Sequence, residues 1–152
     1  MDPSALLIAL VLLGPLVPAQ ELAFHEFFEP ASRELRPSEK LVSLQGQRVR
    51  LAGFMVRSED APTGGFFLCP FPVVATEAGG GTADLPPETA FVVVPSAGGR
   101  TIPHTPRPIA VEGVLELGSR AGEDGQVSLI RIVLDRAIPD AAGGGHPATP
   151  HP

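Results

Sequence analysis

The chain has 152 residues and a net charge of −6, with 18 prolines, 17 glycines, one cysteine and neither tryptophan nor tyrosine. This length accommodates one compact domain, and so many prolines and glycines exclude a bundle of long helices. One cysteine excludes a disulfide within the chain and a zinc site built on several cysteines. The negative charge disfavours nucleic acid as a partner, so we expect none.

Residues 1–19 are predicted to be a signal peptide. Ala5 to Val17 is nearly continuous apolar sequence, and the small residues that end at Ala19 are typical of a signal-peptidase site. The apolar run is shorter than the roughly 20 residues that span a bilayer, so we expect no stable membrane insertion after cleavage. An uncleaved anchor is the alternative, because Asp2 is the charged residue before the run and no Lys or Arg accompanies it. The predicted location is periplasmic or extracellular.

Residues 20–46 are expected to form a short helical segment that packs on the rest of the domain. Glu21 to Glu29 is compatible with a helix that Pro30 stops, because a proline ring blocks helix continuation. Ser38 is a predicted N-cap of a second helical turn, and Gly46 is expected to end it.

Residues 47–140 carry the pattern of a β domain. In Arg48 to Val56 the apolar Val49 and Leu51 alternate with arginines, which is the period of a half-buried strand. Glycine-rich turn signals separate five apolar runs of this kind. The expected strands are Arg48 to Val56, Gly65 to Val74, Thr89 to Val94, Ile109 to Leu117 and Val127 to Ile138.

The strand count and the turns predict an all-β fold, a small five-stranded OB-like antiparallel barrel. Gly53 is expected to mark a bulge or bend in the first strand. In the last strand Ile130, Ile132 and Leu134 are expected to face inward, with Arg131 and Asp135 outside. Residues 141–152 have no apolar periodicity and are expected to be a disordered tail.

The stretch LQGQRVRLAGFMV at 44–56, followed by Gly65-Phe66-Phe67-Leu68, resembles a family of small exported bacterial proteins of unknown function. Those proteins carry a similar first strand, of the form Gly-Lys-Arg-Val-Arg-Leu-Pro-Gly-Tyr-Met, and then a Phe-Leu-Leu second strand. The resemblance covers residues 20–96 and implies an exported domain with an OB-like barrel. Members of the family continue with Cys and His residues in a proline-rich segment, whereas this chain has Cys69 there and no histidine.

Candidate metal ligands are few and depend on one strand register. A first hairpin symmetric about Pro62 places Met55 opposite Cys69, and a thioether beside a thiolate is a ligand set for Cu(I). His104, in a proline-rich loop, is a third candidate ligand. The alternative is that Met55 and Cys69 are soft apolar side chains of the core.

Catalytic motifs are missing from the sequence: no serine has the Gly-x-Ser-x-Gly context, and no glycine-rich stretch leads into Lys-Ser or Lys-Thr. We therefore predict that the chain is not an enzyme and has no cofactor. The preferred interpretation is a noncatalytic exported module of the bacterial cell envelope that binds an envelope protein or a small ligand. The alternative is a periplasmic copper- or zinc-handling protein that uses Cys69 with Met55 or His104.

Overall fold

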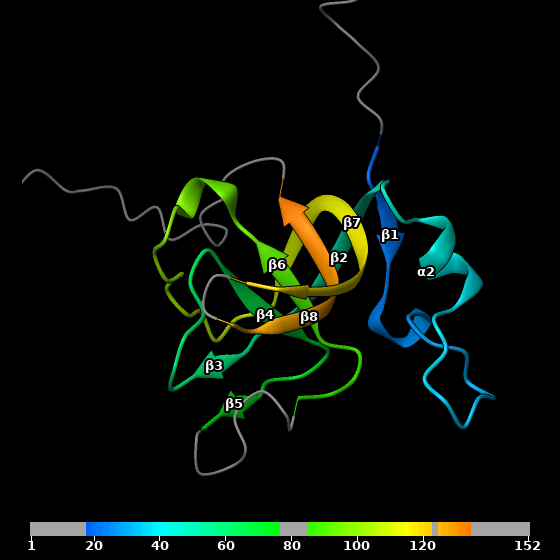
Figure 1. The fold of residues 1–152 in the computed structure, drawn as a ribbon, viewed down its shortest axis with the longest axis horizontal. Helices are drawn as coiled ribbons and strands as arrows, with labels where there is room; N and C mark the ends of the chain where they lie inside the picture. Colours follow the sequence, from blue (N-terminus) through cyan, green and yellow to red (C-terminus); the bar gives the residue numbers. More distant parts are fainter. Residues whose placement is uncertain (1–17, 77–84, 123–124, 135–152) are drawn as a thin grey trace, which may run out of the picture.

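The computed structural model describes residues 18–76, 85–122 and 125–134, and these residues form a mostly β structure (Figure 1). A mixed sheet contains six strands, and two further strands form a small parallel pair. The sheet strands are β1 (Gln20–Leu22), β2 (Arg48–Met55), β4 (Gly65–Cys69), β6 (Ala90–Val93), β7 (Ile109–Ala121) and β8 (Val127–Leu134). The pair is β3 (Arg57–Ser58) with β5 (Val74–Ala75), and the helices are η1 (Phe24–Glu26), α2 (Glu39–Ser43) and η4 (Pro95–Ala97).

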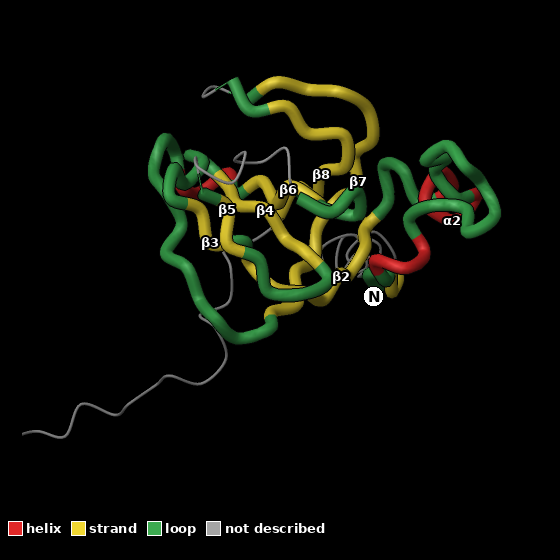
Figure 2. The backbone as a smooth tube through the Cα atoms, turned by 90° about the horizontal axis from the view of Figure 1, so that it is seen from below, coloured by secondary structure: helices red, strands yellow, loops and turns green. Residues whose placement is uncertain are grey.

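The strand pairings form a ring that runs through β2, β4, β6, β8 and β7 and returns to β2. β2 allows this because it changes partner along its length: Arg48 to Gly53 pair with β7, and Phe54 and Met55 pair with β4. In Figure 2 the hairpin of β7 and β8 extends away from the rest of the ring. This extension forms one wall of a cavity.

Gly53 stands where β2 changes partner, as the predicted bend requires. A Cβ atom built on this residue would lie 2.6 Å from the carbonyl oxygen of Cys69 and 2.6 Å from the ring of Phe24. Only glycine lets the neighbouring strand and the aromatic ring approach this closely.

The main core lies between the strands of the ring. Inward-facing side chains such as Val49, Leu51, Leu115 and Ile132 are fully buried, which confirms the alternation expected for β2 and the inner face expected for β8. Side chains from residues 20–46 belong to the same cluster, so this segment packs directly on the sheet. These are Leu22, Phe24, Phe27, Leu41 and Leu44.

The predicted helix over Glu21 to Glu29 is wrong. Gln20–Leu22 instead pairs in parallel with Val49–Leu51 of β2, and a single 3₁₀ turn, η1, follows. β7 pairs with the same β2 residues, so β1 occupies the edge that β7 leaves free. Hydrogen bonds to that edge outweigh the helix propensity of a short segment, which is marginal on its own.

The second predicted helix is present as α2. The Ser38 hydroxyl accepts a hydrogen bond from the backbone N–H of Leu41 at 3.0 Å, which is the N-cap interaction. The same hydroxyl donates to the carbonyl oxygen of Glu26, so it also ties α2 to η1. Gly46 ends the turn with a positive φ of 78°.

The prediction of an all-β fold is confirmed, but two features of the sheet differ from the expected antiparallel arrangement. β6 and β8 run parallel, and β1 adds a sixth strand that also pairs in parallel. The expected strand Gly65 to Val74 is divided, because β4 ends at Cys69 and β5 begins at Val74. Within the described residues, no helix has both the length and the apolar character needed to cross a bilayer. The signal peptide, except for its last two residues, and the tail at 141–152 lie outside the described part of the chain.

Candidate functional site

The register between β2 and β4 separates the predicted ligands Met55 and Cys69. Phe54 lies opposite Cys69 and Met55 lies opposite Leu68, one position away from the symmetric hairpin that would pair Met55 with Cys69. Because successive side chains of a strand point to opposite faces, this shift directs Met55 and Cys69 to opposite sides of the sheet. The predicted Met55–Cys69 pairing is therefore wrong.

The path of the chain between the two strands explains the shift. Arg57–Ser58 leaves the sheet to pair with Val74–Ala75, and Thr63 forms a bridge with Thr101. The connection is thus held by two distant segments, and it is no symmetric hairpin around Pro62.

The two sulfur-containing side chains belong to different apolar clusters. Met55 packs in the main core, whereas Cys69 packs with Val56, Phe67 and Ala75 in a smaller second cluster. The Cys69 Sγ lies 3.2 Å from the hydroxyl oxygen of Thr89. Burial raises the pKa of the Cys69 thiol, which disfavours the thiolate that a metal would bind.

His104 approaches Met55 only through the backbone. Its Nε2 lies 3.3 Å from the carbonyl oxygen of Met55, and the histidine itself is exposed. Among the described residues, no three side chains of His, Cys, Asp or Glu come together in a metal-binding group. The structure therefore does not bring the three predicted ligands to one point.

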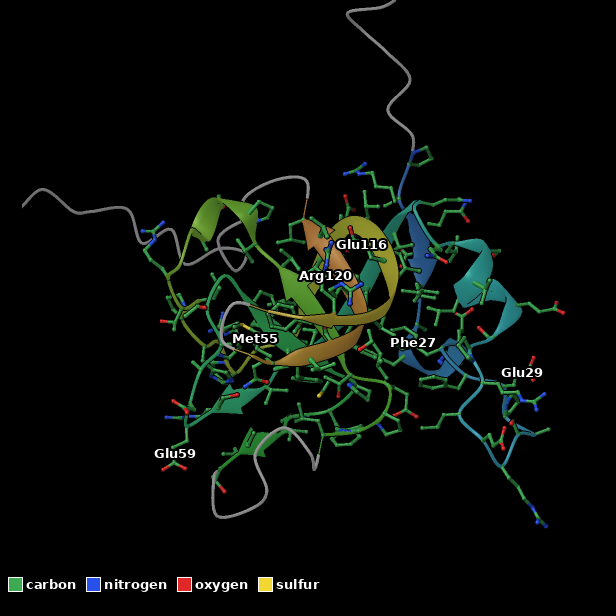
Figure 3. The ribbon with its side chains drawn as sticks, viewed as in Figure 1. Phe27, Glu29, Met55, Glu59, Glu116 and Arg120 are labelled. Carbon is green, nitrogen blue, oxygen red and sulfur yellow. The ribbon has the colours of Figure 1, made fainter. Side chains whose placement is uncertain are left out.

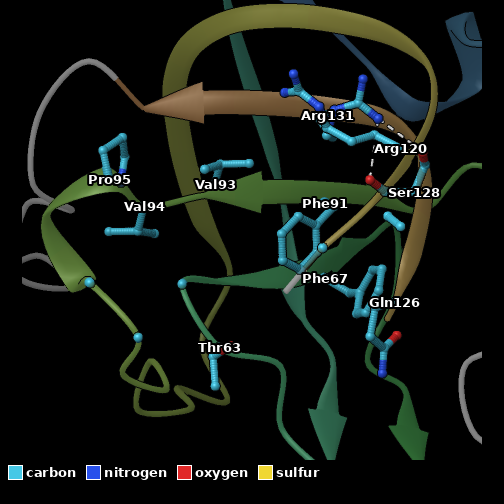
Figure 4. Close-up of a pocket in the computed structure, with 15 residues that line it drawn as sticks. Thr63, Phe67, Phe91, Val93, Val94, Pro95, Arg120, Gln126, Ser128 and Arg131 are labelled. Carbon is cyan, nitrogen blue, oxygen red and sulfur yellow. Dashed lines mark hydrogen bonds between the residues drawn. The ribbon is translucent and has the colours of Figure 1, made fainter. Parts of the chain in front are cut away.

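A cavity of about 700 Å³ lies at another place, between the outer side of β4 and β6 and the extended β7–β8 hairpin (Figure 4). Its walls come from five parts of the chain: the end of the loop before β4, strand β4, strand β6, the η4 turn with the glycines after it, and the β7–β8 hairpin. The lining residues are Thr63, Gly64, Phe67, Phe91, Val93, Val94, Pro95, Gly98, Gly99, Arg120, Ala121, Gly122, Gln126, Ser128 and Arg131.

An aromatic pair forms the apolar floor of the cavity. The rings of Phe67 and Phe91 meet edge to face, with centroids 4.9 Å apart. Phe67 is on β4 and Phe91 is directly opposite on β6, so the pairing of these strands fixes the two rings side by side. Val93 continues the apolar surface along β6.

Two arginines occupy one end of the cavity, beside Ser128 (Figure 4). Arg131 is only 6% exposed. No other charged side chain in the described part of the chain is buried. On β8 Arg131 lies between the inward-facing Ile130 and Ile132, on the outer face as predicted, but there the hairpin buries it. Asp135, predicted on the same face, lies outside the described residues. The Arg131 guanidinium donates to the carbonyl oxygens of Gly118 and Ser128, at 2.7 and 2.9 Å, and to the Glu116 carboxylate at 3.3 Å.

A β-bulge in β7 brings Arg120 to the same place. Opposite Leu129 of β8, β7 has the two residues Gly118 and Ser119, and the pairing shifts between Leu117 and Arg120. Positions four apart in a regular strand are about 13 Å apart. In the bent strand Arg120 Nη1 lies 3.3 Å from Glu116 Oε2, and the two side chains lie side by side in Figure 3.

The sequence offered few signals for this site. Phe67 and Phe91 lie in apolar runs that are typical of any buried strand. Arg131 lies between two apolar residues, which is the pattern of an exposed residue on a half-buried strand. The Gly118-Ser119 pair inside a long alternating strand was the available sign of a bulge, since an isolated glycine in a strand is typical of one.

Comparisons with known proteins find no match to this chain: no family model, no curated protein and no solved structure is similar to it.

Proposed function

We propose that this chain is an exported, noncatalytic binding module that holds a small molecule in the cavity between β4, β6 and the β7–β8 hairpin. The observation that carries the proposal is the cavity itself. Its volume of about 700 Å³ lies within the range of sites that enclose a small ligand, roughly 300 to 1,000 Å³. An apolar floor with a few polar groups at one end is also typical of such sites.

We further propose that the ring of strands is an OB-type barrel. In chain order the ring strands are β2, β4, β6, β7 and β8, and they follow one another in space as first, second, third, fifth and fourth. Five strands, a first strand that changes partner after Gly53, and closure between the first and fourth strands support this assignment. OB-type barrels bind their ligands on the face of the second and third strands, between the first and the last hairpin loops. The cavity has that position, because Phe67 is on the second strand, Phe91 is on the third, and the hairpin before β8 covers them.

Export is supported by the apolar segment before Ala19 and by the resemblance of residues 44–56 and 65–68 to small exported bacterial proteins. A small ligand is favoured over an envelope protein because the lining residues form a hollow rather than a flat apolar face.

The test uses N-phenyl-1-naphthylamine, a neutral apolar dye that fluoresces when it leaves water. We expect the purified chain to bind the dye saturably, with one dye per chain. The substitution Gly99→Trp adds a bulky side chain to the lining of the cavity, at a position where an added Cβ meets nothing within 4 Å. We expect it to weaken dye binding at least about tenfold, which corresponds to the loss of a few apolar contacts.

A second blocking variant and a control complete the experiment. Val93→Trp fills the same cavity from β6, whereas Val42→Trp adds the same side chain at an exposed position of α2. Val42→Trp should bind the dye like the wild type. The proposal is overturned if the wild type shows no saturable binding, or if both blocking variants keep their fold by circular dichroism and bind the dye unchanged.

A further inference from the structure

We infer that the ligand of this cavity carries an anionic group, which Arg120 and Arg131 bind at one end of the cavity. The inference rests on the proposed function, because it names the chemistry of the molecule held in the same cavity. Three observations support it: the charges of the described lining residues, the guanidinium N–H groups that have no partner among the described residues, and the backbone contacts that hold Arg131.

Among the described residues, the charged side chains at this end of the cavity are mainly positive. Two arginines line the cavity, and no acidic side chain is among the described residues that line it. One carboxylate, that of Glu116, lies behind them, and both guanidinium groups contact its Oε2 at 3.3 Å. Two positive charges thus share one negative charge, and a single negative charge on a ligand would balance the group.

The hydrogen-bond donors of the two arginines are only partly used. Arg131 uses Nε for Glu116, and Nη1 for the carbonyl oxygens of Gly118 and Ser128 and for the Ser128 hydroxyl. Arg120 uses Nη1 for Glu116. Within the described residues no partner is found for Nη2 of either side chain, although a guanidinium carries five N–H donors in a rigid fork. Such a fork binds the oxygen atoms of a carboxylate or a phosphate with charge-assisted hydrogen bonds.

The backbone holds Arg131 in one orientation before any ligand arrives. Its Nη1 donates across the bulge to the carbonyl oxygen of Gly118 and along its own strand to the carbonyl oxygen of Ser128. Gly118 has a φ of +111°, a backbone conformation that favours glycine. A guanidinium that is already fixed loses little conformational entropy when it binds an anion. Arg120, whose side chain is mostly exposed, supplies the second group of donors.

The experiment compares two dyes with the same aromatic skeleton. N-phenyl-1-naphthylamine is neutral, and 1-anilinonaphthalene-8-sulfonate adds one sulfonate. We expect Arg120→Gln to raise the Kd of the sulfonate dye about two- to fivefold more than it raises the Kd of the neutral dye, a modest effect because this side chain is mostly exposed to water. We expect Glu116→Gln to lower the Kd of the sulfonate dye by a similar factor, because it releases both guanidinium groups from their carboxylate.

Arg107→Gln is the matched control, because it removes an arginine from an exposed loop that does not line the cavity. It should change neither Kd. The neutral dye also reports whether each variant still folds around the cavity. If it fails to bind the wild type, the proposed function fails. If it binds while the sulfonate dye responds to neither Arg120→Gln nor Glu116→Gln, the inference alone is overturned.

Competition then distinguishes the two biological forms of the anion. Octanoate, octyl phosphate and octanol share one apolar chain and differ in the head group. Displacement of the neutral dye by either anion at lower concentration than by octanol supports the inference and identifies the head group as a carboxylate or a phosphate. Equal displacement by all three overturns it.

Discussion

The thiol sulfur of Cys69 lies 3.2 Å from the hydroxyl oxygen of Thr89, and Cys69 is fully buried. Thr89 Oγ1 also donates to the carbonyl oxygen of Pro86 at 2.6 Å, so the contact ties the segment before β6 to β4. Burial raises the pKa of the thiol above its ordinary value of 9.0. Both the shielding from solvent and the raised pKa make this cysteine unreactive.

We predict that Cys69 in the folded chain reacts with iodoacetamide at pH 8 at least about a hundredfold more slowly than in the denatured chain. Iodoacetamide reacts with the thiolate and must reach the sulfur atom. In the folded chain the raised pKa disfavours the thiolate, and burial keeps the reagent away from the sulfur. Mass spectrometry of timed samples measures the rate. As a control, Gly113→Ala, which weakens the fold as described next, should speed the labelling. A native rate equal to the denatured rate would show that the thiol is not buried.

A second prediction concerns Gly113, where β7 passes between β2 and β8. A Cβ atom at this position would lie 2.2 Å from the carbonyl oxygen of Val133 and 2.7 Å from its carbonyl carbon. Both are backbone atoms, so the strands must move apart. We expect Gly113→Ala to lower the free energy of unfolding by about 2 to 4 kcal/mol, measured by urea denaturation.

Gly99→Ala is the control for this measurement, because an added Cβ there meets nothing within 4 Å and its φ is not positive. It should change the free energy of unfolding by less than about 1 kcal/mol. Equal losses in the two variants would contradict the close approach of β7 and β8.

The third prediction is a pH dependence from the N-terminal segment. The side chain of Lys40 on α2 donates to the carboxylate of Glu26 on η1, and this hydrogen bond is the main reason that the pKa of Glu26 lies below its ordinary value of 4.5. A carboxyl group with a lowered pKa in the folded state stabilises the fold above its unfolded pKa. That contribution is lost as the pH falls through the folded pKa, because the unfolded state then binds the proton more readily.

Lys40→Met should therefore flatten the loss of stability between about pH 5 and pH 3 relative to the wild type. Thermal melts across this range measure the slope. Arg36→Met removes the same charge from an exposed position of the same segment and should leave the slope nearly unchanged. Parallel slopes for the wild type and Lys40→Met would refute the coupling.

Features that repeat within one strand could be predicted from the sequence. Val49 and Leu51 of β2, and Ile130 and Ile132 of β8, alternate with polar neighbours, and both sets are buried as expected. The Ser38 cap was predictable for the same reason, since a cap involves residues only a few positions apart.

Features that depend on distant segments could not be predicted. Gln20–Leu22 became a strand because its partner lies almost thirty positions further along, at Val49–Leu51. The Met55–Cys69 pairing failed because a short parallel pair, Arg57–Ser58 with Val74–Ala75, moves the register of β2 and β4 by one residue.

The candidate site was missed for a related reason. A cavity needs Phe67, Phe91 and the β7–β8 hairpin in their final positions, and no local pattern records this arrangement. Arg131 alternates like an exposed residue, and only the bulge at Gly118 and the Glu116 carboxylate make its burial possible.

Closure of the ring also governs how the domain folds in time. Gly53 pairs with Ile109, and Arg48 pairs with Val114. The first ring strand therefore pairs with residues roughly sixty positions later in the sequence, and this pairing cannot form until those residues are made. Loop-closure entropy must be overcome before such contacts form, and domains dominated by them fold in milliseconds to seconds rather than microseconds. A nascent chain that has not yet reached Ile109 therefore holds β2 with an unpaired edge, open to pairing with another chain. The ring is completed only after synthesis has passed β8, so it remains open for most of the time that the polypeptide is being made.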